Sequence, residues 1–193
     1  MIGGLFRKKD AQRTDYRKSA DKLYAEILMN VRKPVFYEEY GVPDSFDGRF
    51  DLLLVHAFIV LHITMEHEDY EELSQALFDT VFQDMDQTLR EMGIGDMGVP
   101  KHMKRMMKAF NGRMHAYQVA LNPDSLKDIA IEDLKQTNLQ EALKRNLYAT
   151  VSDGKGWNEE YLFLMENFIL KNISDKNTNR VNQLMSGDMT FVI

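Results

Sequence analysis

The chain of 193 residues contains no cysteine, and this absence excludes several kinds of site at once. Disulfide frameworks, thiolate zinc sites and cysteine nucleophiles all need that side chain. A metal ion would need histidine and carboxylate ligands, but none of the five histidines follows a glutamate by three residues, as the di-iron helical bundles require. The segment that begins at His67, His-Glu-Asp-Tyr-Glu, lacks the second histidine of the zinc proteases. We therefore expect no bound metal and no cofactor.

Long apolar runs are also missing, since no segment reaches the roughly 20 residues that span a bilayer. The best candidate, residues 51–65, is interrupted by His56 and His62. These two histidines are six positions apart and lie on divergent faces of a helix, so we interpret both as core or boundary residues. The first residues are too short in apolar length for a signal peptide.

Strand-like alternation is scarce, whereas apolar residues recur every three or four positions along most of the chain. This pattern predicts an all-α fold, one compact domain of about six to seven helices. The helices are expected at residues 14–32, 49–66, 69–92, 100–121, 137–147 and 157–171. The helix at 49–66 is apolar around most of its circumference and is expected at the centre. Outside the helical domain, 14–173, we expect a flexible basic segment at 1–13 and a loosely ordered tail at 174–193.

The net charge is −6, so the molecule as a whole is not an electrostatic binder of nucleic acid, and we expect no DNA partner. The charge is unevenly placed along the chain. Residues 66–91 hold nine acidic residues and one basic residue, whereas residues 99–115 hold five basic residues and no acidic one. This segregation predicts faces with different roles.

The helix expected at 100–121 has two contrasting faces. Seven apolar residues fall within about 100° of one another around its axis; they are Met103, Met106, Met107, Phe110, Met114, Tyr117 and Leu121. Methionine adapts to irregular apolar partners, so this face is either core or a surface for an apolar client. Opposite it lie Lys101, Lys104, Arg105 and Lys108. These cations are either solvated or in contact with RNA phosphates or lipid headgroups.

Residues 93–98, Gly-Ile-Gly-Asp-Met-Gly, have the spacing of a dinucleotide-binding loop. That loop requires a strand before its first glycine, but residues 73–89 have helical spacing. We instead predict a helix cap at Gly93 and a turn, followed by a helix with Pro100 in its first turn. No small-molecule substrate is expected.

Three stretches resemble the ubiquinol-cytochrome c chaperone family, whose members assist assembly of the respiratory cytochrome bc1 complex. They are FYEEYGVPDSFDGRFDLLLVHAFIVL, ALFDTVFQDMDQTLREMGIGDMGVPKHMKRM, and AFNGRMHAYQVAL with ALKRNLY behind it. The resemblance covers about residues 23–148. Lys101 is one of the residues that carry it. The others are Arg49, Asp51, Asp86, Arg90, Glu91, Gly93, Gly95, Asp96, Pro100, Gly112 and Arg113.

The resemblance implies a non-catalytic assembly chaperone that binds newly made cytochrome b and acts near the ribosome. The basic face of the helix at 100–121 adds ribosomal RNA or an anionic membrane surface as candidate partners. The resemblance also implies a helix-turn-helix junction in which Arg90 pairs with Asp86 and Asp96 binds the turn. Gly112, inside a helix, implies close approach by another backbone. The expected location is the cytoplasm, at the inner membrane of a bacterium.

Two other classes remain open on the sequence alone. One is an RNA- or ribosome-binding adaptor that uses the basic face and the basic first segment. The other is a helical haem- or metal-dependent enzyme that uses His56, His62 or His67.

Overall fold

The computed structural model describes residues 3–122, 138–149 and 158–193, with side chains from residue 15 onward. Within these ranges the chain forms helices and no strand, which confirms the all-α prediction. The helices are α1 (Gly3–Val31), α2 (Val35–Glu38), α3 (Phe46–Thr64), α4 (Tyr70–Glu91), α5 (Val99–Leu121), α7 (Leu139–Asn146), α8 (Glu159–Ile173) and α9 (Thr178–Met185).

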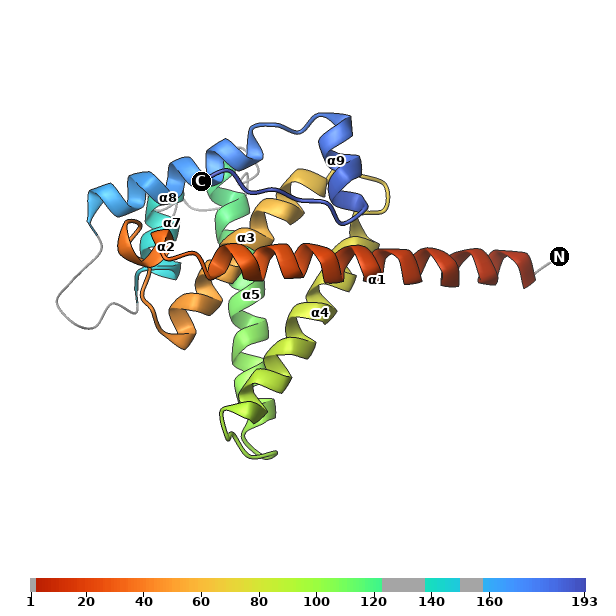
Figure 1. The fold of residues 1–193 in the computed structure, drawn as a ribbon, viewed down its shortest axis with the longest axis horizontal. Coiled ribbons are helices and arrows are strands. Elements are labelled where there is room, and N and C mark those ends of the chain that lie inside the picture. The colour runs from red at the N-terminus through yellow and green to blue at the C-terminus, as the bar shows by residue number, and fades with distance from the viewer. Residues whose placement is uncertain (1–2, 123–137, 150–157) are drawn as a thin grey trace, which may run out of the picture.

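Helix α3 lies at the centre of the fold, as its apolar sequence predicts. Every residue from Phe50 to Thr64 is buried, and α1, α4, α5, α8 and α9 all pack against it. Figure 1 shows α1 crossing the body of the molecule while α4 and α5 project away from it as a hairpin. Despite its length and apolar character, α3 is not a membrane span: no helix in the described ranges is both long and apolar enough to cross a bilayer.

The start of α3 is fixed by a cap and by a close backbone approach. The Ser45 side chain accepts a hydrogen bond from the Gly48 amide at 3.1 Å, which satisfies one of the free N–H groups of the first turn. A β-carbon at Gly48 would overlap the Pro43 carbonyl oxygen, so a side chain is excluded at this position. The preceding connection therefore packs tightly against the first turn of the central helix.

Helix α1 is held along α4 by polar contacts as well as by packing. The Tyr24 hydroxyl donates to Asp84 at 2.6 Å, and the Tyr16 hydroxyl donates to Asp69 at 2.7 Å. Part of the acidic surface of α4 is thus turned toward α1. The helix begins at Gly3, whereas the sequence pattern placed its start at residue 14.

The chain after residue 173 differs from the expected loose tail. It forms α9 and then an extended segment in which Met189 and Phe191 are buried. The Asn172 side chain donates to the Val192 carbonyl at 2.9 Å and accepts from its amide at 3.0 Å, so α8 anchors this segment as a neighbouring strand would. The expectation was wrong because apolar residues near 190 complete the wall around α3.

His56 is a core residue, as the sequence analysis proposed. Its ring lies 4.7 Å from that of Phe191 and 5.1 Å from that of Phe168, centre to centre. Nδ1 is 2.9 Å from the Leu52 carbonyl oxygen, and burial lowers the His56 pKa to about 4, so the ring is neutral near pH 7. His62, at the other end of α3, has Nδ1 2.9 Å from the Gln118 side-chain oxygen.

We expect replacement of Phe191 by Ala to lower the free energy of unfolding by about 3 kcal/mol, because the change opens a cavity against α3 and α8. Urea denaturation followed by circular dichroism measures this loss. Val192→Ala is the matched control, because the Val192 side chain is exposed and its backbone contacts to Asn172 remain. Equal losses in the two variants would contradict a packed role for Phe191.

Candidate interaction surface

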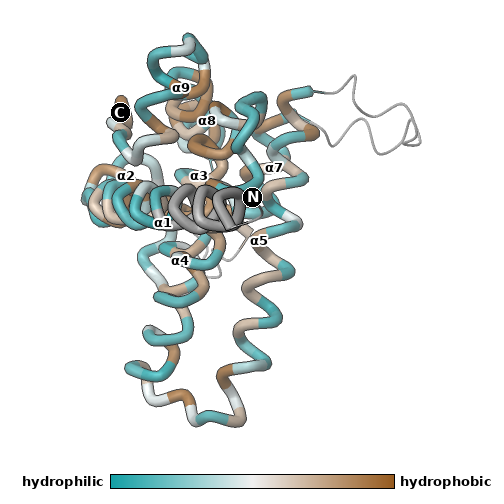
Figure 2. The backbone as a smooth tube through the Cα atoms, turned by 90° about the vertical axis from the view of Figure 1, so that its right-hand side faces the viewer, coloured by the Kyte–Doolittle hydropathy of each residue, from teal (hydrophilic) through white to brown (hydrophobic). Residues whose placement is uncertain are grey.

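The hairpin formed by α4 and α5 projects from the body, and Figure 2 shows both arms joined at their far end by residues 92–98. The first bend of this turn is a helix C-cap. Gly93 has φ of 82°, its amide donates to the Arg90 carbonyl at 2.9 Å, and the Ile94 amide donates to the Leu89 carbonyl at 3.1 Å. These two bonds form a Schellman motif, which confirms the cap predicted at Gly93. A helix therefore enters the glycine motif, where a dinucleotide-binding loop would need a strand.

The second bend leads into α5, with Pro100 in its first turn as expected. The Gly98 amide donates to the Gly95 carbonyl at 2.7 Å, and the Val99 amide reaches the same oxygen at 3.2 Å. Open space surrounds the position of a β-carbon at Gly95 within the described part of the chain, so nothing there explains this glycine.

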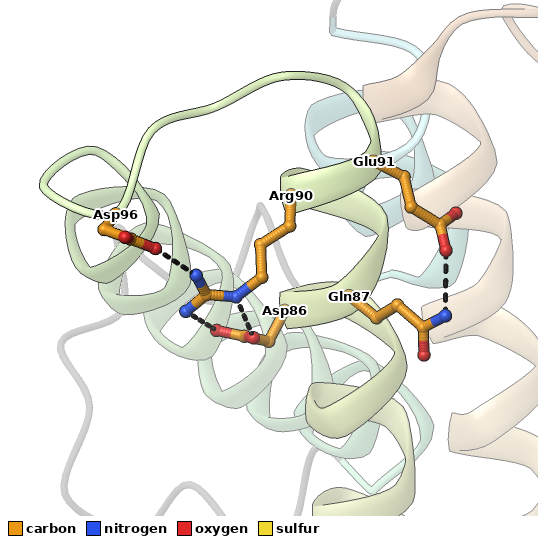
Figure 3. Close-up of polar contacts among 5 residues, drawn as sticks. All are labelled: Asp86, Gln87, Arg90, Glu91 and Asp96. Carbon is orange, nitrogen blue, oxygen red and sulfur yellow. Dashed lines mark hydrogen bonds and ion pairs between the residues drawn. The ribbon is translucent and has the colours of Figure 1, made fainter.

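Arg90 ties the turn to α4, as Figure 3 shows. Its Nε donates to Asp86 at 2.7 Å, and Nη1 donates to Asp96 in the turn. Beside this group, the Gln87 side chain donates to Glu91 at 2.8 Å. The predicted Asp86–Arg90 pair is confirmed, and Asp96 does bond the turn. All these side chains are at the surface, so water screens their charges and their main effect is on the geometry of the turn.

The basic face of α5 is exposed along its first half. Lys101, Lys104, Arg105 and Lys108 all have solvent-exposed side chains. Arg105 lies 3.7 Å from Asp47 at the start of α3. The side chains of Met92 and Met97, in the turn, are 57% and 97% exposed. Sequence reasoning missed these two methionines, although their place in a glycine-rich turn was a usable signal.

The apolar face of α5 is mostly core, which favours the first of the two interpretations of this face. Met106, Phe110 and Tyr117 are buried, and Met103 and Met114 are half-buried against the core. Phe110 lies edge-on to Phe78 of α4, with ring centres 5.2 Å apart. Of the seven apolar residues on this face, Met107 alone is exposed. Because α3 and α4 bury most of this face, only its edges are accessible.

One edge of that face opens into a cleft of about 380 Å³ between α3, α4 and α5. Aromatic and sulfur-containing side chains dominate its lining, with histidine and amide groups at the mouth. The main lining residues are Phe58, His62, Met65, Tyr70, Phe110, Met114, His115 and Gln118. This mixture suits an apolar group with a few polar contacts around it.

A buried ion pair joins α3 to α5. Asp51 is 2% exposed, and its Oδ1 lies 2.8 Å from Arg113 Nη2; Arg113 Nε also donates to the Asn146 carbonyl at 3.3 Å. Burial raises the Asp51 pKa to about 7, and the positive charge of Arg113 opposes this rise. The structure thus brings together two family-motif residues that lie far apart in sequence.

The other predicted motif residues have local roles or none that the structure explains. Arg49 bonds Asp44 at 2.6 Å, and its guanidinium lies 4.9 Å from the centre of the Tyr37 ring. Gly112 is exposed, and no described atom lies within 4 Å of a β-carbon built there. The close backbone approach expected at Gly112 is therefore wrong for the described part of the chain. Across that same part, no three histidine or carboxylate side chains lie close enough to hold a metal ion.

These features define an all-helical protein whose distinctive surface is a projecting hairpin, held to the core by a buried ion pair. The chain belongs to the ubiquinol-cytochrome C chaperone family, because the family model matches residues 38–161, more than half of its length. This match confirms the resemblance read from the sequence.

A solved structure agrees with that assignment. The crystal structure of the Cbp3 homolog from Brucella abortus is 29% identical in sequence, with a TM-score of 0.70, and the match covers 100% of this chain and 97% of that one. No curated protein sequence matches the chain.

We expect Arg113→Met to lower the free energy of unfolding by about 3 kcal/mol, because it leaves a buried carboxylate without its partner. Asp51→Asn should cost less, since the amide oxygen still accepts a hydrogen bond from Arg113 and the guanidinium left without its counter-ion is partly exposed to water. Urea denaturation of both variants measures the difference.

The raised pKa of Asp51 also predicts that the free energy of unfolding depends on pH. The Asp51 pKa rises from 3.8 unfolded to about 7 folded, so the folded chain binds this proton more tightly. The Asp51 contribution to stability is therefore greatest below pH 4 and declines as the pH rises to about 7. Asp51→Asn should remove that decline, and Arg113→Met should extend it to higher pH. Identical pH profiles for wild type and Asp51→Asn would contradict this account.

Proposed function

We propose that this protein is a non-catalytic chaperone that holds newly made cytochrome b during assembly of ubiquinol-cytochrome c reductase. The observation that carries the proposal is the family match, which spans α3, the α4–α5 hairpin and α7. The chain works at the cytoplasmic face of a bacterial inner membrane, where cytochrome b is inserted. The similarity to the Cbp3 homolog from Brucella abortus supports a bacterial setting.

The cleft between α3, α4 and α5 is the proposed client site. Cytochrome b presents apolar helices before its partners arrive, and their side chains need shelter from water. Met65 and Met114 contribute flexible, polarizable walls that adapt to different side chains. Phe58 and Phe110 form a rigid floor from α3 and α5. Entry of a client side chain requires no opening of the core, because the cleft is already accessible.

A second candidate function is an RNA- or ribosome-binding adaptor. The exposed basic face of α5 favours it, because phosphate contacts release counterions and depend steeply on salt. Ribosome association that survives Lys101→Glu, Lys104→Glu and Lys108→Glu, or that does not weaken with salt, would argue against this function.

The chaperone proposal is tested by capture of cytochrome b with the tagged protein and by the amount of assembled reductase in a deletion strain. We expect capture in wild type and loss of the complex on deletion. Normal assembly without capture would overturn the proposal.

The cleft is tested by Met65→Glu, since this side chain is 38% exposed at the mouth. A charge there should reduce recovery of cytochrome b about tenfold, because the carboxylate would lose water when an apolar client covers it. The control is Met29→Glu on α1, where the methionine is 54% exposed and does not line the cleft. Equal recovery with both variants would show that the client binds elsewhere.

A further inference from the structure

We propose that the far end of the α4–α5 hairpin docks on an anionic membrane surface. Lys101, Lys104 and Lys108 would lie against lipid phosphates, while Met97 enters the boundary between headgroups and acyl chains. This inference concerns a surface separate from the client cleft, and it does not depend on which client the protein holds.

The cations form one continuous stripe. At 100° per residue, Lys101, Lys104 and Lys108 fall within about 60° of one another around the α5 axis. All three are exposed, and no carboxylate in the described ranges lies within ion-pair distance of them. Arg105 extends the stripe toward the body, where it meets Asp47. The stripe is therefore available to an external anion.

The turn adds apolar groups at the far end of the hairpin. Met97 is almost fully exposed, and Met92 is more than half exposed, at the two sides of the turn. Met97 lies four residues before Lys101, so this end of the hairpin combines an exposed apolar side chain with exposed cations. The turn that carries both methionines has a fixed conformation, because the Schellman hydrogen bonds at Gly93 and the Arg90–Asp96 contact hold it (Figure 3).

The combination of charges and methionines favours lipid over RNA. A bilayer surface offers phosphates and, a few ångströms deeper, an apolar layer, so it satisfies both kinds of side chain. Single-stranded RNA is held by stacking of its bases on aromatic rings, and residues 92–98 contain none. A phosphate backbone would engage the lysines but would leave Met97 in water.

The acidic residues of the hairpin determine which of its two arms faces an anionic membrane. Asp86 and Glu91 lie on α4 and Asp96 lies in the turn, and Arg90 binds Asp86 and Asp96. Glu91 accepts a hydrogen bond from Gln87 on the same helix. The carboxylates of α4 are thus repelled by an anionic surface while the lysines of α5 are attracted, and Arg90 offsets the charge of Asp96 in the turn that docks. The hairpin should approach with the lysine side of α5 facing the lipid.

The first test is binding of the purified protein to vesicles of phosphatidylglycerol mixed with phosphatidylcholine, and to vesicles of phosphatidylcholine alone. We expect binding to the anionic vesicles only. Lys101→Glu with Lys104→Glu and Lys108→Glu should weaken it by at least about tenfold. The control variant carries Lys18→Glu, Lys171→Glu and Lys176→Glu. These lysines are exposed outside the hairpin, and their replacement gives the same change in net charge.

The second test reads insertion of the turn directly. Because the chain has no cysteine, Met97→Cys can carry a single fluorophore that responds to the polarity of its surroundings. Its emission should shift to the blue on anionic vesicles, whereas a label at Met29→Cys should not change. Circular dichroism of each variant confirms that it is folded.

Three outcomes would overturn the proposal. The first is an equal loss of vesicle binding in the two triple variants. The second is binding without any change in emission at position 97. The third is tight, lysine-dependent binding to an RNA homopolymer together with no binding to anionic vesicles.

Discussion

The need to cover α3 on all sides governs the rest of the structure. A helix buried from residue 50 to residue 64 offers no face to water, so the fold must supply neighbours around its whole circumference. The chain does this with helices from both of its ends and from its middle. The polar groups that α3 carries into the core are handled locally: Thr64 donates to the Val60 carbonyl, and His56 bonds that of Leu52. His62 instead bonds Gln118 of α5, and Asp51 is the charged exception, because its ion-pair partner Arg113 also lies on α5.

That exception links the core to the projecting hairpin. α5 turns one face to α3 and α4 and leaves the other to solvent, so the same helix stabilises the body and presents the lysines. Arg113 fixes α5 at one end by contacts to α3 and α7, while Arg90 shapes the turn at the other. The surface charges are consequently carried on a rigid element, which favours defined contacts over diffuse attraction.

The sequence was a good guide wherever a pattern reports local geometry. Helical spacing located α3 as the central element, the glycine after residue 92 marked a helix cap, and a separation of four residues paired Asp86 with Arg90. The sequence was a poor guide to the packing partner of each apolar helix face. An amphipathic stripe has the same appearance whether its partner is another helix of the chain or a separate protein, so the sequence left open whether Met106, Phe110 and Tyr117 belong to the core or to a client surface. Pairings between distant positions, such as Asp51 with Arg113 and His56 with Phe191, leave no periodic signal at all.

The packing of Phe191 against His56 has a consequence for synthesis of the chain. Residues of α3, in the first half of the sequence, pack against residues near position 190, so α3 is fully covered only after the end of the chain has been synthesised. Until those residues leave the ribosome, one side of the most apolar helix is open to water and to other nascent chains. A chaperone of this architecture is itself aggregation-prone while it is being translated, and a premature stop only a few residues before position 190 would yield a product for degradation rather than a slightly shortened protein.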